Sequence, residues 1–389
     1  MANWKVTAMN ERMISEEILK KTAELRKQIH ENPELGNQEY QTAELVEHVL
    51  QECGIETKRY LDTAVIGILH CGQGGKTVAL RADLDALPLE EKTGCAFSSK
   101  NTGVMHACGH DVHTASLLGA AMALSKERER LNGTVVFIFQ PDEEGNGGAQ
   151  RLIDAGVLEG VDAVFGCHVA PDLPEGTVGI RYGKFYAASD MFDVTIKGKA
   201  SHGAQPEKGI DALVTAAKAI SAIDEIHRSE KDRCAVSVGM MQAGTVRNAI
   251  ADEACFSGII RSLGKENRAH LKQRLQQCIC EASQNSGASY EISLKESYGG
   301  IVNTDGETDV ARKAAESAFG TDNVVEIQEP LMTTEDFGCY VDYACGSFYH
   351  IGAGCGFPLH SPYFIPGEKA LETAVIMHVS VVKEYLKQG

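Results

Sequence analysis

Thiol and imidazole side chains crowd into one short segment of the chain, residues 106–113 (HACGHDVH). Cys108 and His110 are separated by a single glycine, and His106 and His113 stand on either side of them. Cysteine thiolates and neutral imidazoles are zinc ligands, and packing alone rarely explains so dense a group. For His106 and His113 taken singly, a supporting hydrogen-bond role is as well favoured as metal ligation. The segment indicates metal chemistry.

A group of carboxylates follows an apolar run: residues 140–145 (QPDEEG) come directly after residues 135–139. Asp142, Glu143 and Glu144 would repel one another if nothing compensated their charge. Two adjacent carboxylates are stable when a cation neutralises one of them, and the other then remains available as a general base. A solvated acidic turn explains this motif equally well when the motif is taken alone.

Two single histidines extend the set of possible metal ligands. His168 follows the apolar residues 163–166, and His360 lies in residues 358–362 (PLHSP). Either histidine alone is more typical of a structural residue. The complete donor set is Cys108, His110, Glu144, His168 and His360. These nitrogen, oxygen and sulfur donors suit zinc, manganese or nickel better than calcium or magnesium, and they suffice for two metal ions if Cys108 bridges.

The elements that must position these residues alternate between helices and buried strands in the first half of the chain. Helical periodicity is present at 14–30, 42–50 and 114–124, and short apolar runs typical of strands occupy 64–70, 77–81 and 134–139. This alternation predicts an α/β domain with a mostly parallel central sheet. Open sheets of this kind bind ligands at the carboxyl ends of their strands, where these polar clusters fall.

The pattern changes near residue 187. A strand at 189–196, a helix at 211–223 and strands at 235–241 and 255–261 predict a smaller α+β domain. Long helices then return at 308–319 and 368–386, around an apolar strand at 347–351. We therefore predict a discontinuous catalytic domain, residues 1–186 and 299–389, into which a second domain, residues 187–298, is inserted.

Composition excludes several classes of function. The net charge of −17 and the lack of a basic stripe argue against nucleic-acid binding. There is no 18-residue apolar run for a membrane span, and the first thirty residues lack the pattern of a secretory signal. With 12 scattered cysteines, we expect reduced thiols and a cytoplasmic protein.

Eight segments together resemble one known family, the aminoacylase branch of the two-metal peptidases. They are residues 25–34 (LRKQIHENPE), 81–88 (RADLDALP), 106–114 (HACGHDVHT), 140–144 (QPDEE), 201–210 (SHGAQPEKGI), 248–253 (NAIADE), 334–337 (TEDF) and 359–360 (LH). The resemblance spans nearly the whole chain in family order. The branch contains hippurate hydrolases, N-acyl-L-amino acid amidohydrolases, auxin-conjugate hydrolases and N-acetyldiaminopimelate deacetylases.

The resemblance implies two divalent metal ions per subunit (Zn, Mn, Ni or Co) on the five donors above, with Glu143 as the general base. It also implies that the inserted domain is a lid through which subunits form a homodimer or a dimer-based oligomer. Many relatives carry a His-x-Asp first motif, whereas this chain has Asp83 and Asp85 there and Cys108 at the bridging position. This departure is typical of the cysteine-bearing branch, and it leaves the native metal open.

The resemblance implies three further residues in the inserted domain. His202 matches a histidine that hydrogen-bonds the oxyanion of the tetrahedral intermediate, often from the partner subunit. Relatives use an asparagine and an arginine near the terminal carboxylate of the substrate, and Asn248 and Arg261 stand in matching or nearby segments. Taken alone, His202 is typical of a surface or capping residue, and a solvated strand-end charge explains Arg261 equally well.

These observations predict a metal-dependent amidohydrolase that cleaves small N-acylated amino acids by a metal-activated water. A dipeptidase or aminopeptidase is the main alternative, because it uses the same chemistry but recognises a free amine. A non-catalytic metal-binding protein is a second alternative, although Glu143 beside Glu144 argues against it, since a pure binder does not need a free base. The acyl group and the amino acid remain open.

Overall fold

The computed structural model describes residues 14–72 and 74–387. The chain divides into two compact units. The first extends to Gly183 and resumes with Asn303–Gln328 and the residues from Cys339 onward, and the second contains Lys184–Val302 and Glu329–Gly338. Sequence patterns put the inserted segment at 187–298 and do not indicate the return of residues 329–338. That return rests on long-range pairing, such as the bridge between Tyr186 and Leu331.

In the described ranges, the first unit is built on a sheet of eight strands. Their order across the sheet is β1 (Glu56–Tyr60), β2 (Ala64–Cys71), β4 (Gly133–Gln140), β3 (Thr77–Asp83), β5 (Ala163–Ala170), β16 (Cys345–Gly352), β6 (Val178–Ile180) and β15 (Val324–Glu326). The central neighbours β4, β3, β5 and β16 run parallel, while β1, β2 and β4 pair antiparallel, as do β16 and β6. The predicted α/β fold with a mostly parallel sheet is confirmed.

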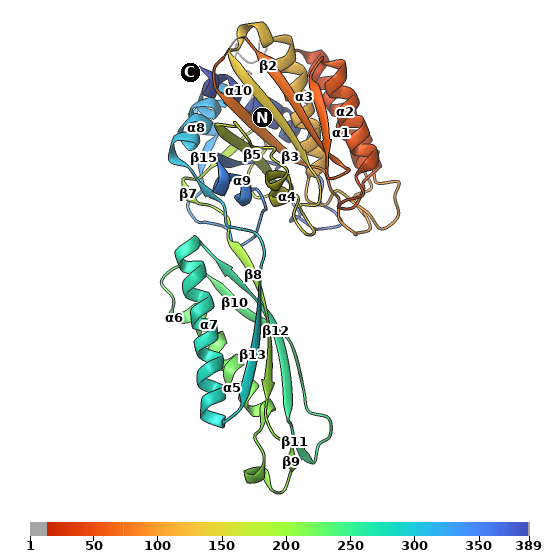
Figure 1. Cartoon of the computed structure of the whole chain (residues 1–389). Coiled ribbons are helices and arrows are strands. Elements are labelled where there is room, and N and C mark those ends of the chain that lie inside the picture. The colour runs from red at the N-terminus through yellow and green to blue at the C-terminus, as the bar shows by residue number, and fades with distance from the viewer. Residues whose placement is uncertain (1–13, 73, 388–389) are drawn as a thin grey trace. The chain divides into compact units, whose positions relative to one another are not determined.

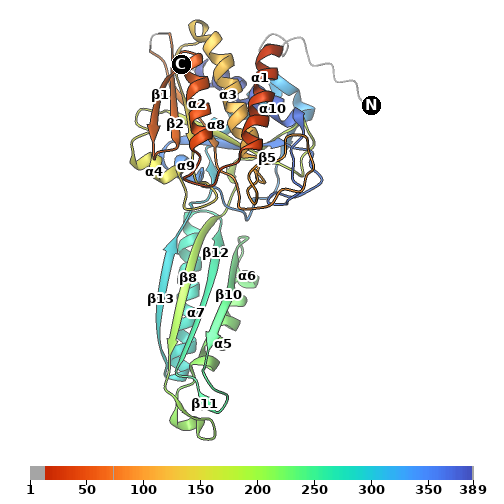
Figure 2. The same ribbon diagram turned by 90° about the vertical axis from the view of Figure 1, so that its right-hand side faces the viewer.

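Helices cover this sheet (Figure 1). The long helices are α1 (Glu16–Glu31), α2 (Tyr40–Glu52), α3 (His110–Lys126), α8 (Asp305–Phe319) and α10 (Glu368–Leu386). Two short helices, α4 (Ala149–Asp154) and α9 (Gly338–Tyr343), and 3-10 turns at Arg128–Arg130 and Thr321–Asn323 lie between these elements. Ser15 begins α1 by accepting a hydrogen bond from the Ile18 N–H (3.4 Å). α3 packs against both α1 and α10 (Figure 2) and is buried on nearly all sides. Such a helix needs apolar residues all round, and its position is correspondingly fixed.

The second unit has an antiparallel sheet in the order β10 (Ala235–Ala243), β12 (Glu253–Ser262), β8 (Ala188–Lys197) and β13 (Ser289–Glu296). Helices α5 (Ala212–Asp224) and α7 (Lys265–Ser286) pack on one face of it (Figures 1 and 2), and α6 (Ile226–Ser229) follows α5. The sequence patterns do not predict α7 and β13.

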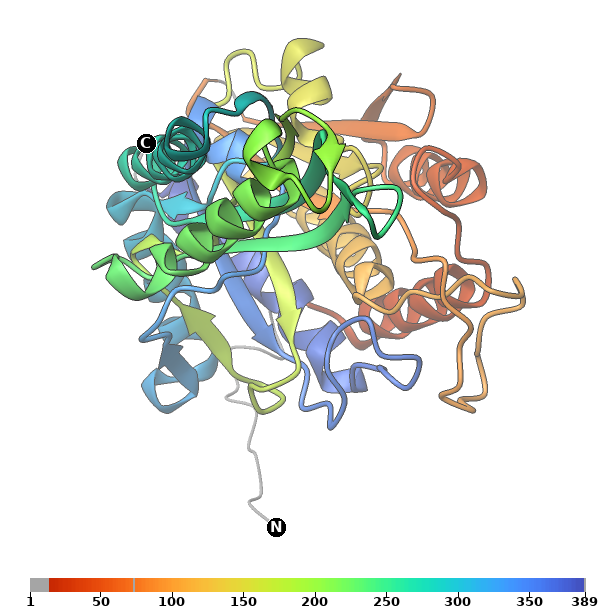
Figure 3. The same ribbon diagram turned by 90° about the horizontal axis from the view of Figure 1, so that it is seen from below.

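Short elements complete the second unit. The two-residue strands β9 (Ser201–His202) and β11 (Ala249–Ile250) pair with each other, and a 3-10 turn occupies Pro206–Lys208. Figure 3 looks at this unit from its β9–β11 end, so that α7 is seen nearly along its axis. β7 (Gly183–Lys184) and β14 (Val302–Asn303) lie where the chain passes between the units. No helix within residues 14–72 or 74–387 has the length and apolar character needed to cross a bilayer.

Candidate metal centre

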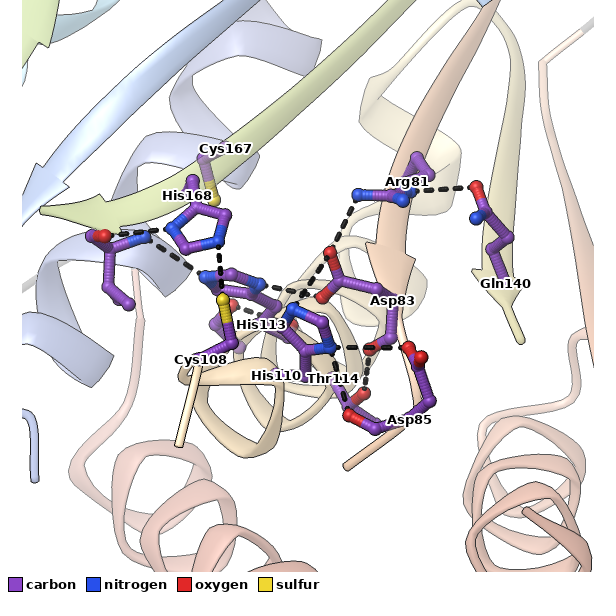
Figure 4. Close-up of polar contacts among 12 residues, drawn as sticks. Arg81, Asp83, Asp85, Cys108, His110, His113, Thr114, Gln140, Cys167 and His168 are labelled. Atoms are coloured by element: carbon purple, nitrogen blue, oxygen red, sulfur yellow. Dashed lines mark hydrogen bonds and ion pairs between the residues drawn. The ribbon is translucent and has the colours of Figure 1, made fainter. Parts of the chain in front are cut away.

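The polar clusters predicted from the sequence meet at one edge of the large sheet. β3 ends at Asp83, β4 ends at Gln140, and β5 runs parallel beside β3. The carboxyl ends of β4, β3 and β5 therefore lie together, as open α/β sheets require of a ligand site. Figure 4 shows the side chains that these strands and the start of α3 bring into contact.

Gly109 sets the turn between Cys108 and His110. Its φ is 88°, a left-handed conformation, and a Cβ atom built there would lie 2.4 Å from Cγ2 of Val169. Only glycine fits such a position without strain. The turn allows α3 to begin at His110 rather than at Thr114, where the apolar pattern predicted its start.

Cys108, His110 and His168 form one group of donors within 4.8 Å of one another. The Cys108 Sγ lies 3.3 Å from Nε2 of His168 (Figure 4). His168 donates from Nδ1 to the Val169 carbonyl (2.8 Å), so the lone pair on Nε2 faces the thiol. His168 lies inside β5 rather than beyond its end, because the strand continues past the predicted residues 163–166 to Ala170.

Cys108, Glu144 and His360 form a second group within the same distance. The His360 Nε2 lies 3.1 Å from the Glu144 Oε1. His360 has a left-handed backbone, with φ of 62°, which is uncommon for a residue with a side chain. The structure thus brings all five sequence-predicted donors together, and Cys108 belongs to both groups.

Glu143 lies beside these donors. It is 6% exposed and forms a third group with His110 and Glu144. Glu143 is thus a buried carboxylate next to the donor set that neither of the two groups requires, which makes it the candidate for a general base.

The charges of the cluster call for a cation. Burial, together with the negative charges of Glu144 and Glu143, raises the pKa of Cys108 well above the usual value for a thiol. A bound metal ion reverses this preference, since a coordinating thiol loses its proton. The His110 Nε2 is buried and accepts or donates no hydrogen bond within the described part of the chain. The charged Asp83 Oδ2 lies 3.7 Å from this nitrogen, and an imidazole nitrogen without a hydrogen bond fits a divalent metal.

Asp83 and Asp85 are hydrogen-bonded to the metal-donor residues or to their neighbours and orient them. The Asp83 carboxylate lies 2.7 Å from Nδ1 of His113, which in turn accepts the Val169 N–H at Nε2 (3.0 Å). Arg81 donates to the other oxygen of Asp83 (2.7 Å). Burial alone would raise the pKa of Asp83, but His110, His113 and Arg81 outweigh it and hold that pKa well below its usual value. Both ring nitrogens of His113 are thus engaged, and its role here is supporting.

Asp85 fixes two of the donors directly. Its carbonyl accepts a hydrogen bond from Nδ1 of His110 (2.9 Å), and its carboxylate accepts the Glu144 N–H (2.9 Å). His106, by contrast, makes no hydrogen bond from either ring nitrogen to the residues that the structure describes. Burial lowers the pKa of His106 to about 3, so this imidazole is neutral.

Glu39 is a supporting residue that sequence reasoning missed. Its buried carboxylate accepts the Asp142 N–H (3.0 Å) and the Thr63 hydroxyl (2.8 Å). Asp142 has a φ of 59°, so Glu39 holds a left-handed turn immediately before Glu143. Glu39 precedes an amphipathic helix, and no motif or periodicity marks it as part of the site.

The remaining predicted residues lie in the second unit. His202 and Asn248 are exposed neighbours, since His202 pairs with Ala249 and the Gly203 N–H donates to the Asn248 carbonyl (2.8 Å). The His202 Nδ1 accepts the Ala204 N–H (3.1 Å), which leaves Nε2 to carry the proton and to donate.

Arg261 lies near the other end of the sheet. It is half-buried close to the end of β12, and burial lowers its pKa. Its Nη1 is buried and finds no hydrogen-bond acceptor in residues 14–72 and 74–387. Arg261 lies eight residue steps along the extended strand from Glu253, where β12 starts, a span of roughly 25 Å. Arg261 is therefore not brought together with His202 and Asn248 within one chain's second unit.

Comparison with known proteins places these features in a family. Residues 79–384 match the model of peptidase family M20/M25/M40. The chain is 39% identical to thermostable carboxypeptidase 2 of Saccharolobus solfataricus, over 91% of this chain and 93% of that protein. It is 38% identical to N-acetylcysteine deacetylase of Bacillus subtilis, over 90% and 93%.

A solved structure agrees with these relatives. The Bacillus subtilis YXEP protein, described as a dinuclear metal binding peptidase of the M20 family, superposes with a TM-score of 0.87. It shares 35% sequence identity with this chain and covers 96% of it and 99% of its own length.

Proposed function

The chain belongs to peptidase family M20/M25/M40, whose members include metal-dependent hydrolases of amide bonds, and from this premise we propose that it hydrolyses small N-acyl amino acids. The observation that carries the proposal is the position of Cys108 in two donor groups, with Glu143 beside both. A dinuclear site is typical of the family.

The residues would divide two metal ions between them. Cys108, His110 and His168 would hold one ion, and Cys108, Glu144 and His360 would hold the other. Zn, Mn, Ni or Co would suit these donors. When bound, the two ions polarise the amide carbonyl and acidify a water molecule. Asp83 and Asp85 act through His113, His110 and Glu144, whose orientation they hold.

Glu143 is the proposed general base. It takes a proton from the attacking water and delivers one to the leaving nitrogen. Burial beside the donors keeps bulk water from competing for this proton. Glu39, through the Asp142 N–H, holds the turn that carries Glu143.

The second unit supplies the remaining contacts. His202, whose Nδ1 accepts the Ala204 N–H, would donate from Nε2 to the oxyanion, and Asn248 and Arg261 would bind the substrate carboxylate. The buried, open Nη1 of Arg261 supports this role, because a guanidinium fork matches a carboxylate. The two ends of β12 lie roughly 25 Å apart, which is farther than a small substrate can reach. A substrate that contacts both Asn248 and Arg261 would therefore contact one of them from each of two subunits. We therefore propose a homodimer, or an oligomer built from dimers, in the cytoplasm.

Two relatives support a substrate that carries a carboxylate next to the scissile amide. An N-acyl amino acid and a peptide cut at its C-terminus both present a carboxylate next to the scissile amide. Similarity to a deacetylase and to a carboxypeptidase is therefore consistent with recognition of that carboxylate. A dipeptidase or aminopeptidase would need, in addition, an acceptor for the free substrate amine.

A substrate panel tests the proposal. N-acetyl and N-benzoyl amino acids and free-amine dipeptides are assayed with the purified protein after loading with Zn, Mn, Co or Ni. We expect turnover of the N-acyl compounds with at least one metal. Activity on free-amine dipeptides alone would contradict the proposed deacylase function and favour a dipeptidase or aminopeptidase. Inactivity on every amide, with metal bound, would favour a non-catalytic metal-binding protein.

A further inference from the structure

A separate group of donor atoms lies in the first unit, between α1 and the loop that leads to Cys108. It consists of His30, Glu91 and Cys95, whose donor atoms lie within 4.8 Å of one another. None of the three belongs to the dinuclear set. We propose that these residues form a third metal site, which binds a zinc ion and ties residues 91–95 to α1.

The spacing of the donors matches a tetrahedral zinc ion. The His30 Nε2 lies 3.4 Å from the Glu91 Oε1, and the Cys95 Sγ lies 3.7 Å from the same oxygen. Ordinary zinc–nitrogen, zinc–oxygen and zinc–sulfur lengths at tetrahedral angles separate the ligand atoms by roughly 3.3–3.6 Å. The side chains therefore need to shift little to accept the ion.

The imidazole of His30 is already oriented as a zinc ligand requires. His30 is fully buried in α1, and its Nδ1 lies 2.9 Å from the Asp111 carboxylate. Arg26 donates to the same Asp111 oxygen (3.0 Å) and fixes its position. A carboxylate on the far nitrogen of a zinc-binding histidine sets the tautomer and strengthens the ligand. Nε2 is thus directed at Glu91, on the side of the ring away from Asp111.

The charges of the cluster allow the exchange of protons for zinc. Without metal, Arg26 and a protonated His30 balance Asp111 and Glu91. Binding of Zn²⁺ releases one proton from His30 and one from the Cys95 thiol, so the net charge of the cluster does not change. A buried cluster that stays neutral avoids the cost of an uncompensated charge.

The choice of zinc follows from the donors and their exposure. Thiolate and imidazole select zinc over calcium or magnesium. Cys95 and Glu91 are half-buried rather than sealed, so solvent can complete the fourth position. The ion would add a link between α1 and a loop that Glu91 braces internally through Thr93 and Ser99. This loop already contacts α1 through the Lys100 N–H, which donates to the Glu31 carbonyl (2.8 Å), and through Phe97, which packs on His30.

Zinc stoichiometry tests the proposal. The full chain is stripped of metal, loaded with Zn²⁺, dialysed and analysed for zinc per subunit, as wild type and as Cys95→Ser, Glu91→Gln and Cys53→Ser. Cys53 is the matched control, because it is also half-buried in the first unit but lies at the end of α2. We expect about three zinc ions in wild type and Cys53→Ser and one fewer in the other two proteins.

A second measurement guards against misfolding of a variant. Loading with Co²⁺ gives thiolate-to-cobalt absorption, and Cys95→Ser should lose the part that Cys53→Ser keeps. Circular dichroism of both proteins checks the fold. Equal zinc content in wild type and Cys95→Ser, with equal cobalt spectra, would overturn the third site and leave a simple salt bridge at His30. Amide hydrolysis is measured separately. A protein that binds a third zinc ion but hydrolyses no amide would contradict the proposed function and still support this site.

Discussion

The candidate residues of the two units differ in how firmly their own chain holds them. In the first unit, most of the metal-binding side chains are buried, and Asp83, Asp85 and Glu39 orient their neighbours. In the second unit, His202 and Asn248 are exposed, on or beside two-residue strands. The side chains of the first group lose their conformational freedom when the chain folds. The exposed side chains of the second group would lose theirs only when a substrate or a partner subunit binds.

The difference separates two kinds of mutation. Changes in the first unit should alter metal content or the chemical step, since these depend on preorganised geometry. Changes in the second unit should leave metal content alone and act on transition-state or substrate contacts.

Replacement of the base should have the largest effect. Glu143→Gln keeps the shape of the side chain but cannot take a proton, so we expect kcat to fall by roughly 10²–10⁴. Metal content, measured by elemental analysis, should remain that of wild type. A variant with wild-type kcat would remove Glu143 from the mechanism.

His202→Ala should lower kcat by about 10²–10³, the usual loss for an oxyanion donor, with folding and metal content unchanged. A mixture with Glu143→Gln subunits distinguishes two arrangements. Partial recovery of activity, once subunits have exchanged, means that His202 serves the neighbouring chain. No recovery after proven exchange would place its action within its own chain or nowhere.

Cys108→Ser should weaken metal binding, because a donor shared by two groups is lost. Loss of even an outer contact typically costs ~10–100-fold in metal affinity, and a bridging ligand should cost at least that. Titration of the metal-free protein with Zn²⁺ or Mn²⁺ measures the change. Full metal content with unchanged affinity would show that Cys108 does not bridge.

Arg261→Ala should act on substrate binding. We expect KM for an N-acyl amino acid to rise about tenfold, which corresponds to one charge-assisted contact. KM for the matching N-acyl amino acid amide, which lacks the carboxylate, should change little. Equal effects on both substrates would assign Arg261 a structural role.

Glu39→Gln should have the smallest effect, and it depends on pH. Burial raises the pKa of Glu39 from 4.5 to about 7, against hydrogen bonds that lower it. A raised pKa means that the stability contributed by Glu39 is present below pH 4.5 and lost as pH rises through 7. The unfolding free energy of wild type relative to Glu39→Gln should therefore fall by roughly 1–3 kcal/mol between pH 4.5 and 8. A constant difference, measured by urea unfolding, would contradict this environment for Glu39.

The main features of the fold follow from local patterns. The alternation of helices and apolar strands predicts the α/β sheet, because burial on both faces leaves continuous apolar runs. β6 and β15, with three residues each, are too short to show a period. α7 presents a narrow stripe of Leu271, Leu275 and Ile279 on an otherwise polar helix, so the pattern is easily overlooked.

Some residues of the candidate site can likewise be predicted from the sequence, and others cannot. Cys108, His110 and the paired glutamates are recognisable because chemically specific residues stand close together in the sequence. Glu39 acts on Asp142 from 103 residues away, and only the folded chain creates that contact. The tautomers of His113 and His168 likewise depend on the backbone of Val169, which no spacing of residues predicts.

The length of β12 has a consequence for how the protein would behave on dilution. If Asn248, which precedes the start of this strand, and Arg261, near its end, serve one substrate, an isolated subunit cannot complete a site. Specific activity would then fall as the protein concentration drops below the dissociation constant of the dimer. A newly made subunit would be inert until it met a second copy, and the onset of activity would be second order in protein.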